Sequence, residues 1–319
     1  MNQLDQLKNM TQVVTDTGNI DAIATFKPQD ATTNPTLILK ACTLPQYQDL
    51  IFSAVDWARQ QGGNLAEKIS WAMKKLLVNF GVSILTIIPG RISTEIDARL
   101  SFDTSGSIRQ AQELIELYRQ AGISRERILI KIAATWEGIQ AATELERQGI
   151  HCNLTLIFDI IQAVACANAG ISLVSPFVGR IYDWYQQRGS ENFLSGQDPG
   201  VLSVQKIYTY LQHFSYPTRV MGASFRHIEQ IRALAGCDFL TISPPLLTEL
   251  QQATGILPRR LDPQIAKQTA VEKIQVDEES FRWQMNENSM ATEKLAEGIR
   301  LFSEDHNKLA AQLSSSISA

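Results

Sequence analysis

The sequence is poor in the residues that build disulfide frameworks and metal centres. Its 319 residues include only four cysteines and four histidines, and no two cysteines form a CxxC pair. We therefore expect neither a disulfide framework nor a zinc site, and the histidines show no HExxH or other ligand spacing. Glycine-rich phosphate loops of the GxGxxG or GxxxxGK[ST] type are also missing, which argues against a doubly wound nucleotide-binding sheet.

Charge and hydrophobic patterning exclude two further classes of partner. The 29 basic and 33 acidic residues leave a formal net charge of −4, so no basic surface for nucleic acid or anionic lipid is expected. No stretch approaches the roughly 18 apolar residues of a membrane helix. The start, MNQLDQLKNM, lacks the basic-then-apolar pattern of a signal peptide. We therefore expect a soluble, cytoplasmic protein that binds neither nucleic acid nor membrane.

Short β-type runs alternate with amphipathic helical patterns along most of the chain. Strands are predicted at residues 12–17, 30–34, 91–97, 127–133, 151–157, 171–176, 218–224 and 238–244. The spacing of apolar residues predicts helices at 104–121 and 135–148, and two long helices at 40–61 and 64–88. Eight strand–helix units are typical of an α/β fold of the (β/α)8 TIM-barrel type with extra helices. A doubly wound open sheet is the main structural alternative.

The segment after the eighth strand is expected to form a C-terminal helix packed on the barrel, or helping to form a subunit contact. Its apolar stripe at helical spacing consists of Leu295, Ile299, Phe302, Leu309 and Leu313. The last six residues, SSSISA, are expected to fray. Since no internal repeat or low-complexity linker interrupts the chain, we expect residues 1–319 to form a single barrel domain.

A single lysine stands inside the apolar run ILIKIAATWEG at 128–138. Side chains alternate along a strand, so Lys131 shares one face with Leu129 and Ala133. Both faces look buried, as in a parallel strand covered by helices. A buried lysine is costly unless it has partners or a role, and a desolvated amine is the usual Schiff-base nucleophile. Lys131 is therefore a candidate nucleophile, and the alternative is a lysine at the barrel rim whose amine reaches water.

Other polar side chains lie near the carboxyl ends of the expected strands, where barrel enzymes place their active sites. They are Asp16, Asn34, Glu95, Asn153, Thr155, Ser175, Arg180, Ser224 and Arg226, with Phe177 among them. Taken singly, Asp and Asn more often form caps and turns, and an arginine more often forms a surface ion pair. Together they suit one chemistry, because carboxylates transfer protons, amides hold hydroxyl groups and arginines bind phosphate.

Seven segments closely resemble the transaldolase family of class I Schiff-base enzymes. They are VVTDTG (13–18), DATTNP (30–35), GRISTEIDARLS (90–101), ILIKIAATWEG (128–138), CNLTLIF (152–158), SPFVGRI (175–181) and MGASFR (221–226). The resemblance implies a barrel enzyme of the pentose phosphate pathway that transfers a dihydroxyacetone unit between phosphorylated sugars, without a cofactor or metal. The implied donors are sedoheptulose 7-phosphate or fructose 6-phosphate. The implied acceptors are glyceraldehyde 3-phosphate or erythrose 4-phosphate.

The resemblance also implies a catalytic role for four of the candidate residues. Lys131 would attack the C2 ketone of the donor and form the iminium. Glu95, with a water held by Thr155, would transfer the protons needed for dehydration. Asp16 would take the proton of the C4 hydroxyl as the C3–C4 bond breaks.

The remaining candidates would bind substrate. The resemblance implies that hydroxyl groups are held by Asn34, Asn153 and Ser175, that the phosphate is held by Arg180, Ser224 and Arg226, and that Phe177 limits water near the intermediate. A homodimer is a further expectation from the family. Two alternatives stay open: a fructose 6-phosphate aldolase-type lyase that releases dihydroxyacetone, and a catalytically silent sugar-phosphate-binding barrel.

Overall fold

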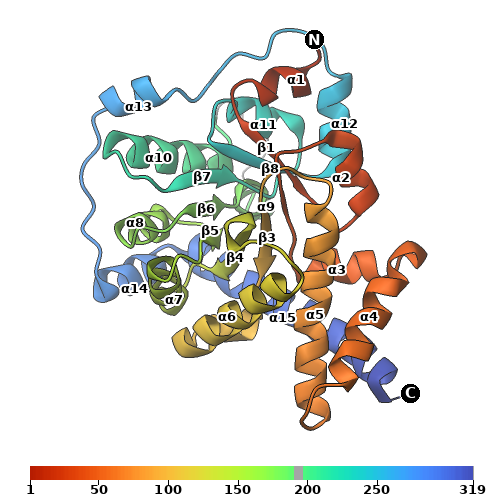
Figure 1. Ribbon diagram of the computed structural model, residues 1–319. Helices are drawn as coiled ribbons and strands as arrows, with labels where there is room; N and C mark the ends of the chain where they lie inside the picture. Colours follow the sequence, from red (N-terminus) through yellow and green to blue (C-terminus); the bar gives the residue numbers. More distant parts are fainter. Residues whose placement is uncertain (190–196, 319) are drawn as a thin grey trace.

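A closed barrel of eight parallel strands forms the centre of the computed structural model (Figure 1), which describes residues 1–189 and 197–318. Each strand pairs with its neighbours in sequence, and β1 closes the barrel on β8. The strands are β1 (Gln12–Asp16), β2 (Asp30–Thr32), β3 (Ile92–Glu95), β4 (Ile128–Ala133), β5 (Cys152–Ile157), β6 (Leu173–Pro176), β7 (Arg219–Gly222) and β8 (Phe239–Ile242). The predicted TIM barrel is confirmed, and each strand is slightly shorter than the run that predicted it.

Helices surround the barrel on its outside (Figure 1). They are α1 (Gln3–Lys8), α2 (Ile20–Phe26), α3 (Pro35–Cys42), α4 (Gln48–Arg59), α5 (Leu65–Leu85), α6 (Thr104–Gln120), α7 (Trp136–Arg147), α8 (Ile160–Asn168), α9 (Val178–Gln187), α10 (Pro199–His213), α11 (Ile228–Ala233), α12 (Pro244–Gln252), α13 (Pro263–Gln268), α14 (Glu278–Glu287) and α15 (Ser289–Ser318). Short 3-10 turns occupy Pro45–Tyr47, Ala98–Leu100 and Arg125–Arg127.

The expected helix at 40–61 is wrong, because two helices and a 3-10 turn share that region. Proline has no N–H for a helical hydrogen bond and disfavours helical backbone in the preceding residue. Leu44 accordingly adopts an extended conformation before Pro45, with φ −86° and ψ 128°. The chain therefore leaves α3 at Cys42 and re-enters a helix only at Gln48.

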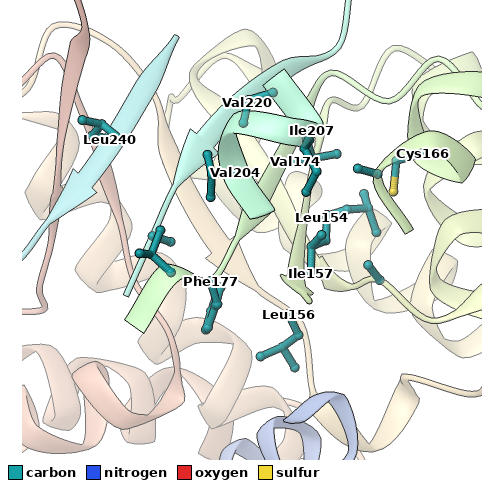
Figure 2. Close-up of a cluster of buried hydrophobic side chains, with 14 of the residues drawn as sticks. Leu154, Leu156, Ile157, Cys166, Val174, Phe177, Val204, Ile207, Val220 and Leu240 are labelled. Atoms are coloured by element: carbon teal, nitrogen blue, oxygen red, sulfur yellow. The ribbon is translucent and has the colours of Figure 1, made fainter. Parts of the chain in front are cut away.

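Two sets of apolar side chains make up the barrel core. The interior set is Val14, Leu129, Leu173, Met221 and Phe239. The outward set packs under the helices, and Figure 2 shows Leu154, Val174 and Val220 of neighbouring strands close to side chains of α8 and α10. Lys131 follows Leu129 on the inward face, so the predicted alternation along β4 is confirmed.

The last helix, α15, packs across the molecule as predicted. Figure 1 shows α14 beside α7 and α8, and the end of α15 beside α4. Leu309 and Leu313 are buried with side chains of α3, α4 and α5. Arg59 of α4 donates a 2.6 Å hydrogen bond to the Ser316 carbonyl. These contacts keep the chain helical through Ser318, so the expectation of a frayed end is wrong for residues 314–318.

Candidate active site

A cavity of about 320 Å³ opens at the carboxyl ends of the strands. Nine of the eleven predicted site residues line it: Asp16, Asn34, Lys131, Thr155, Ser175, Phe177, Arg180, Ser224 and Arg226. The other two lie directly behind this wall, because Glu95 contacts the Lys131 amine and Asn153 contacts the Ser175 hydroxyl. Barrel closure therefore brings together residues that lie more than two hundred positions apart in the chain.

A second cavity, of about 810 Å³, lies at the opposite end of the barrel around the first residues of β1 and β7. It is the larger of the two, but none of the predicted site residues lines it. Barrel enzymes carry out their chemistry at the carboxyl ends of the strands, where the loops meet. The smaller cavity, with its buried amine and carboxyls, is therefore the candidate active site.

The Lys131 amine lies inside the barrel and not at its rim. Lys131 is 4% exposed, so the alternative of an amine that reaches water is wrong. Its Nζ lies 3.1 Å from Glu95 Oε2, and it donates a 3.2 Å hydrogen bond to the Thr33 carbonyl. The register explains the first contact, since Glu95 on β3 and Lys131 on β4 are direct partners in the sheet.

Two acidic groups face this amine from different strands. Burial raises the pKa of Glu95, and the Lys131 charge opposes that shift. Burial likewise raises the pKa of Asp16, against the opposing effects of Lys131 and of a 2.9 Å hydrogen bond from Thr32. A carboxyl whose pKa is raised can hold a proton nearer neutral pH, so both groups are suited to donate as well as accept protons.

Two buried oxygen atoms beside the lysine have unused hydrogen-bonding capacity. Within residues 1–189 and 197–318, Thr155 Oγ1 has no hydrogen-bond partner, and the contact of Glu95 Oε2 is its 3.1 Å ion pair with Lys131. Buried polar atoms rarely stay unpaired in proteins. A substrate oxygen or a water molecule fits this position.

A chain of hydrogen bonds fixes the amide of Asn153. Its Nδ2 donates to Ser93 Oγ over 3.1 Å, and its Oδ1 accepts from Ser175 Oγ over 2.6 Å. All three residues are buried. Asn34 has a different environment, because its Oδ1 accepts a 2.9 Å hydrogen bond from the Leu37 N–H and caps α3. The cap interpretation therefore holds for Asn34, although the residue also lines the cavity.

The opposite end of the cavity carries two arginines. Arg226 pairs with Asp183 through Nε and Nη2 over 2.6–3.1 Å, and its Nη1 donates to Ser224 Oγ over 3.3 Å. Arg180 forms no ion pair within the described part of the chain, and its buried Nη1 has no partner there. Burial and the neighbouring Arg226 charge lower the pKa of Arg180. An anion between these two side chains would gain charge-assisted hydrogen bonds.

Sequence reasoning missed several residues in and around the cavity, among them two that line it, Thr32 and Phe302, and one that supports it from outside the lining, Asp183. Thr32 hydrogen bonds with Asp16, Asp183 pairs with Arg226, and Phe302 of α15 closes one side of the cavity. Asp183 could have been considered from the sequence, because it lies three residues after Arg180 on α9 and therefore on the same helix face as that predicted site residue. Phe302 lay on the predicted apolar stripe, which indicated packing and not a place in the site.

The described residues contain neither a candidate metal-binding cluster nor a membrane-spanning helix. No group of three or more histidine, cysteine, aspartate or glutamate side chains within residues 1–189 and 197–318 is arranged to hold a metal ion. Among the helices in the same ranges, none has both the length and the apolar character needed to cross a membrane.

Comparison with known proteins agrees with this geometry. Residues 13–313 match the family described as Transaldolase/Fructose-6-phosphate aldolase. A protein of Methylococcus capsulatus named Transaldolase is 57% identical over 305 residues, which cover 94% of this chain and 93% of the relative. Proteins of the same name from Alteromonas mediterranea and Homo sapiens are each 56% identical, covering 100% and 97% of this chain and 99% and 93% of the relative. The chain therefore belongs to the transaldolase/fructose-6-phosphate aldolase family.

Proposed function

We propose that this enzyme, a transaldolase by family and by its near full-length relatives, transfers a dihydroxyacetone unit from a ketose phosphate to an aldose phosphate through a Schiff base on Lys131. The proposed donors are sedoheptulose 7-phosphate or fructose 6-phosphate, and the proposed acceptors are glyceraldehyde 3-phosphate or erythrose 4-phosphate. One observation carries the proposal: a buried amine lies 3.1 Å from a buried carboxyl, in a cavity that ends in two arginines.

The first half of the proposed reaction forms the covalent intermediate. The neutral Lys131 amine attacks C2 of the ketose, and the resulting carbinolamine loses water to give the iminium. Glu95 supplies the proton for the departing hydroxyl group, and its raised pKa favours this role. The unpaired Thr155 hydroxyl would hold the water molecule that relays the proton.

The second half breaks and remakes a carbon–carbon bond. Asp16 accepts the proton of the C4 hydroxyl, the electrons of the C3–C4 bond move to the iminium, and the aldose leaves an enamine on Lys131. C3 of this enamine attacks the acceptor aldehyde, and Asp16 returns its proton to the new alkoxide. Hydrolysis of the iminium then releases the new ketose and the free amine.

The remaining cavity residues would hold the substrate during both halves. Asn34, Asn153 and Ser175 offer amide and hydroxyl groups to the sugar hydroxyls. The phosphate would bind between the two arginines and the Ser224 hydroxyl. The aromatic ring of Phe177 lines the cavity, and there it would limit water near the intermediate and favour capture by an aldose.

Reduction with borohydride tests the covalent site directly. Incubation with fructose 6-phosphate and borohydride should add a dihydroxyacetone-derived mass to the peptide that contains Lys131. The Lys131→Met variant should give no adduct. Lys40 is the matched control, since it is an exposed lysine that also lines the cavity, and Lys40→Met should still be trapped. An adduct on another lysine would refute the proposed nucleophile, and a wild-type protein without any adduct would support the silent barrel.

A lyase remains the second candidate, because the family description names fructose 6-phosphate aldolase as well. The name shared by the relatives at 54–57% identity supports the transferase. Turnover of fructose 6-phosphate without an acceptor separates the two activities. Without an acceptor, a transaldolase should release little dihydroxyacetone. When erythrose 4-phosphate is added, it should convert fructose 6-phosphate to glyceraldehyde 3-phosphate and form sedoheptulose 7-phosphate, whereas a lyase should release free dihydroxyacetone at full rate without any acceptor.

A further inference from the structure

The guanidinium of Arg180 lies against two aromatic rings, and the charges of Glu297, Glu95 and Asp16 act on it without forming a close ion pair in the described ranges. Its Cζ lies 5.1 Å from the centre of the Phe177 ring and 5.2 Å from the centre of the Phe302 ring. No carboxylate forms an ion pair with it in the described ranges, and its Nη1 is buried without a partner. Two cation–π contacts therefore orient a buried cation whose hydrogen-bonding capacity is still free.

The C-terminal helix α15 supplies one of these rings and the space beside it. Gly298 and Phe302 lie one turn apart, so they face the same side of α15. A Cβ atom at position 298 would lie only 3.0 Å from Arg180 Nη1 and 2.7 Å from Leu156 Cδ2. Glycine inside a helix costs about 1 kcal/mol relative to alanine. A glycine at this position is therefore explained by the close approach of Arg180 and Leu156 to the helix.

An irregularity in β5 places Leu156 against the same helix turn. The pairing of β5 with β6 shifts register between Leu154 and Ile157, and Leu156 has a φ of +56°, which is uncommon for a residue other than glycine. Figure 2 shows Leu156 apart from Leu154 and Ile157 and directed toward the blue ribbon of α15. The strand and the helix thus meet beside Arg180.

We propose that α15 is a working part of the phosphate-binding end of the cavity, with Phe302 and Gly298 positioning the Arg180 guanidinium for the substrate phosphate. The inference rests on the proposed function and deepens it. According to this proposal, Phe302 and Gly298 help to determine the preference for phosphorylated over unphosphorylated sugars, although both lie far from Lys131 in the sequence. Neither residue touches the reacting carbons, so both are positioning residues.

The test compares a phosphorylated substrate with an unphosphorylated one. Phe302→Leu removes the ring and keeps an apolar side chain, and Gly298→Ala adds one methyl group against Arg180. Phe302→Leu should raise the KM for fructose 6-phosphate about fivefold to thirtyfold, the range expected for loss of a desolvated cation–π contact. Gly298→Ala should raise the same KM, because its methyl group would displace Arg180. Inhibition by inorganic phosphate should weaken by a similar factor. Borohydride trapping of dihydroxyacetone, which has no phosphate, should stay within about twofold of the wild-type rate.

Two further variants separate positioning from simple packing. Phe302→Tyr keeps the aromatic face and should restore the KM to within about threefold of the wild-type value. Leu301→Ala alters the neighbouring side chain, which is 41% exposed and does not line the cavity, and should leave both substrates unaffected. Thermal unfolding of every variant checks that it is folded. If Phe302→Leu does not fold, the single methyl group of Gly298→Ala still provides the test.

Several outcomes would overturn the inference. An unchanged KM for fructose 6-phosphate in both Phe302→Leu and Gly298→Ala would do so. An equal loss of fructose 6-phosphate turnover and dihydroxyacetone trapping would also do so, because it would indicate general damage to the barrel. A Phe302→Tyr variant as impaired as Phe302→Leu would exclude the aromatic contact as the cause. Failure of the proposed function looks different, since the wild-type enzyme would then form no dihydroxyacetone adduct.

Discussion

A double-mutant cycle can measure the buried ion pair between Lys131 and Glu95. The cycle needs Glu95→Gln, Lys131→Met and the double variant. The charged atoms are 3.1 Å apart and the side chains are only 5% and 4% exposed. At an effective dielectric constant of about 20, two unit charges at this distance attract by about 5 kcal/mol. Desolvation of both groups opposes this attraction, so the intact pair contributes little net stability.

Breaking the pair from one side should cost more than removing it. Each single substitution leaves an uncompensated buried group, and we expect the free energy of unfolding to fall by about 3 kcal/mol. The remaining group can change its protonation state, which keeps the loss below the full Coulomb energy. The double variant should lose less stability than either single variant, so the coupling energy should exceed about 3 kcal/mol.

Urea unfolding of the four proteins, followed by circular dichroism, measures the coupling. Lys74 and Glu113 provide a matched control pair at 2.8 Å, in which the glutamate is 39% exposed, and their coupling should be below about 1 kcal/mol. In parallel, Lys131→Met should abolish turnover, and Glu95→Gln should lower kcat about 10²- to 10⁴-fold. Additive stability effects for Lys131 and Glu95, within about 0.5 kcal/mol, would refute the contact. The proposed proton donor would then lie too far from the amine.

Three further predictions follow from the same geometry. Asp183→Asn should release Arg226 and raise the KM for fructose 6-phosphate about tenfold, as expected for loss of a charged hydrogen-bond partner, and an unchanged KM would show that Asp183 does not orient the arginine. Asp16→Asn should lower kcat about 10²- to 10⁴-fold yet leave trapping of dihydroxyacetone intact, because that substrate has no C3–C4 bond to break; loss of trapping would contradict this role. His306 lies on α15, with its Nε2 3.2 Å from Asp97 Oδ2, and burial lowers its pKa. The folded state therefore binds a proton on the His306 ring more weakly than the unfolded state does. The contribution of neutral His306 to the stability of the fold is complete above the ordinary histidine pKa of about 6.5, and it is lost as the pH falls below that value. The melting temperature should therefore drop less between pH 7 and pH 5 in His306→Gln than in the wild-type protein, and equal drops would refute this assignment.

Much of the barrel could be predicted because its signals are local. The eight strands follow from short apolar runs, and the alternation along β4 placed Lys131 on the same face as Leu129, which the structure shows to be the interior face. The prediction of one helix at residues 40–61 failed because the apolar spacing continues through Pro45. Proline has no backbone N–H donor there, which interrupts the helix.

The candidate site could be predicted only where position along a strand was sufficient. Residues at strand ends, such as Asp16 and Ser175, converge in any closed parallel barrel. Asp183 and Phe302 were missed because their roles depend on which side chains of other elements they contact. The register shift near Leu156 was also hidden, since nothing in the run CNLTLIF indicates a positive φ.

The sequence by itself determined the barrel, the inward lysine and the family, because alternation of side chains and contiguous motifs are properties of neighbouring residues. Tertiary structure alone decided that the Lys131 amine lies against Glu95 under nearly complete burial, and that a ring from α15 covers Arg180. Desolvation and Coulomb energies depend on distances between residues that are remote in the chain. Those distances exist only after the barrel has closed and the last helix has packed across its carboxyl end.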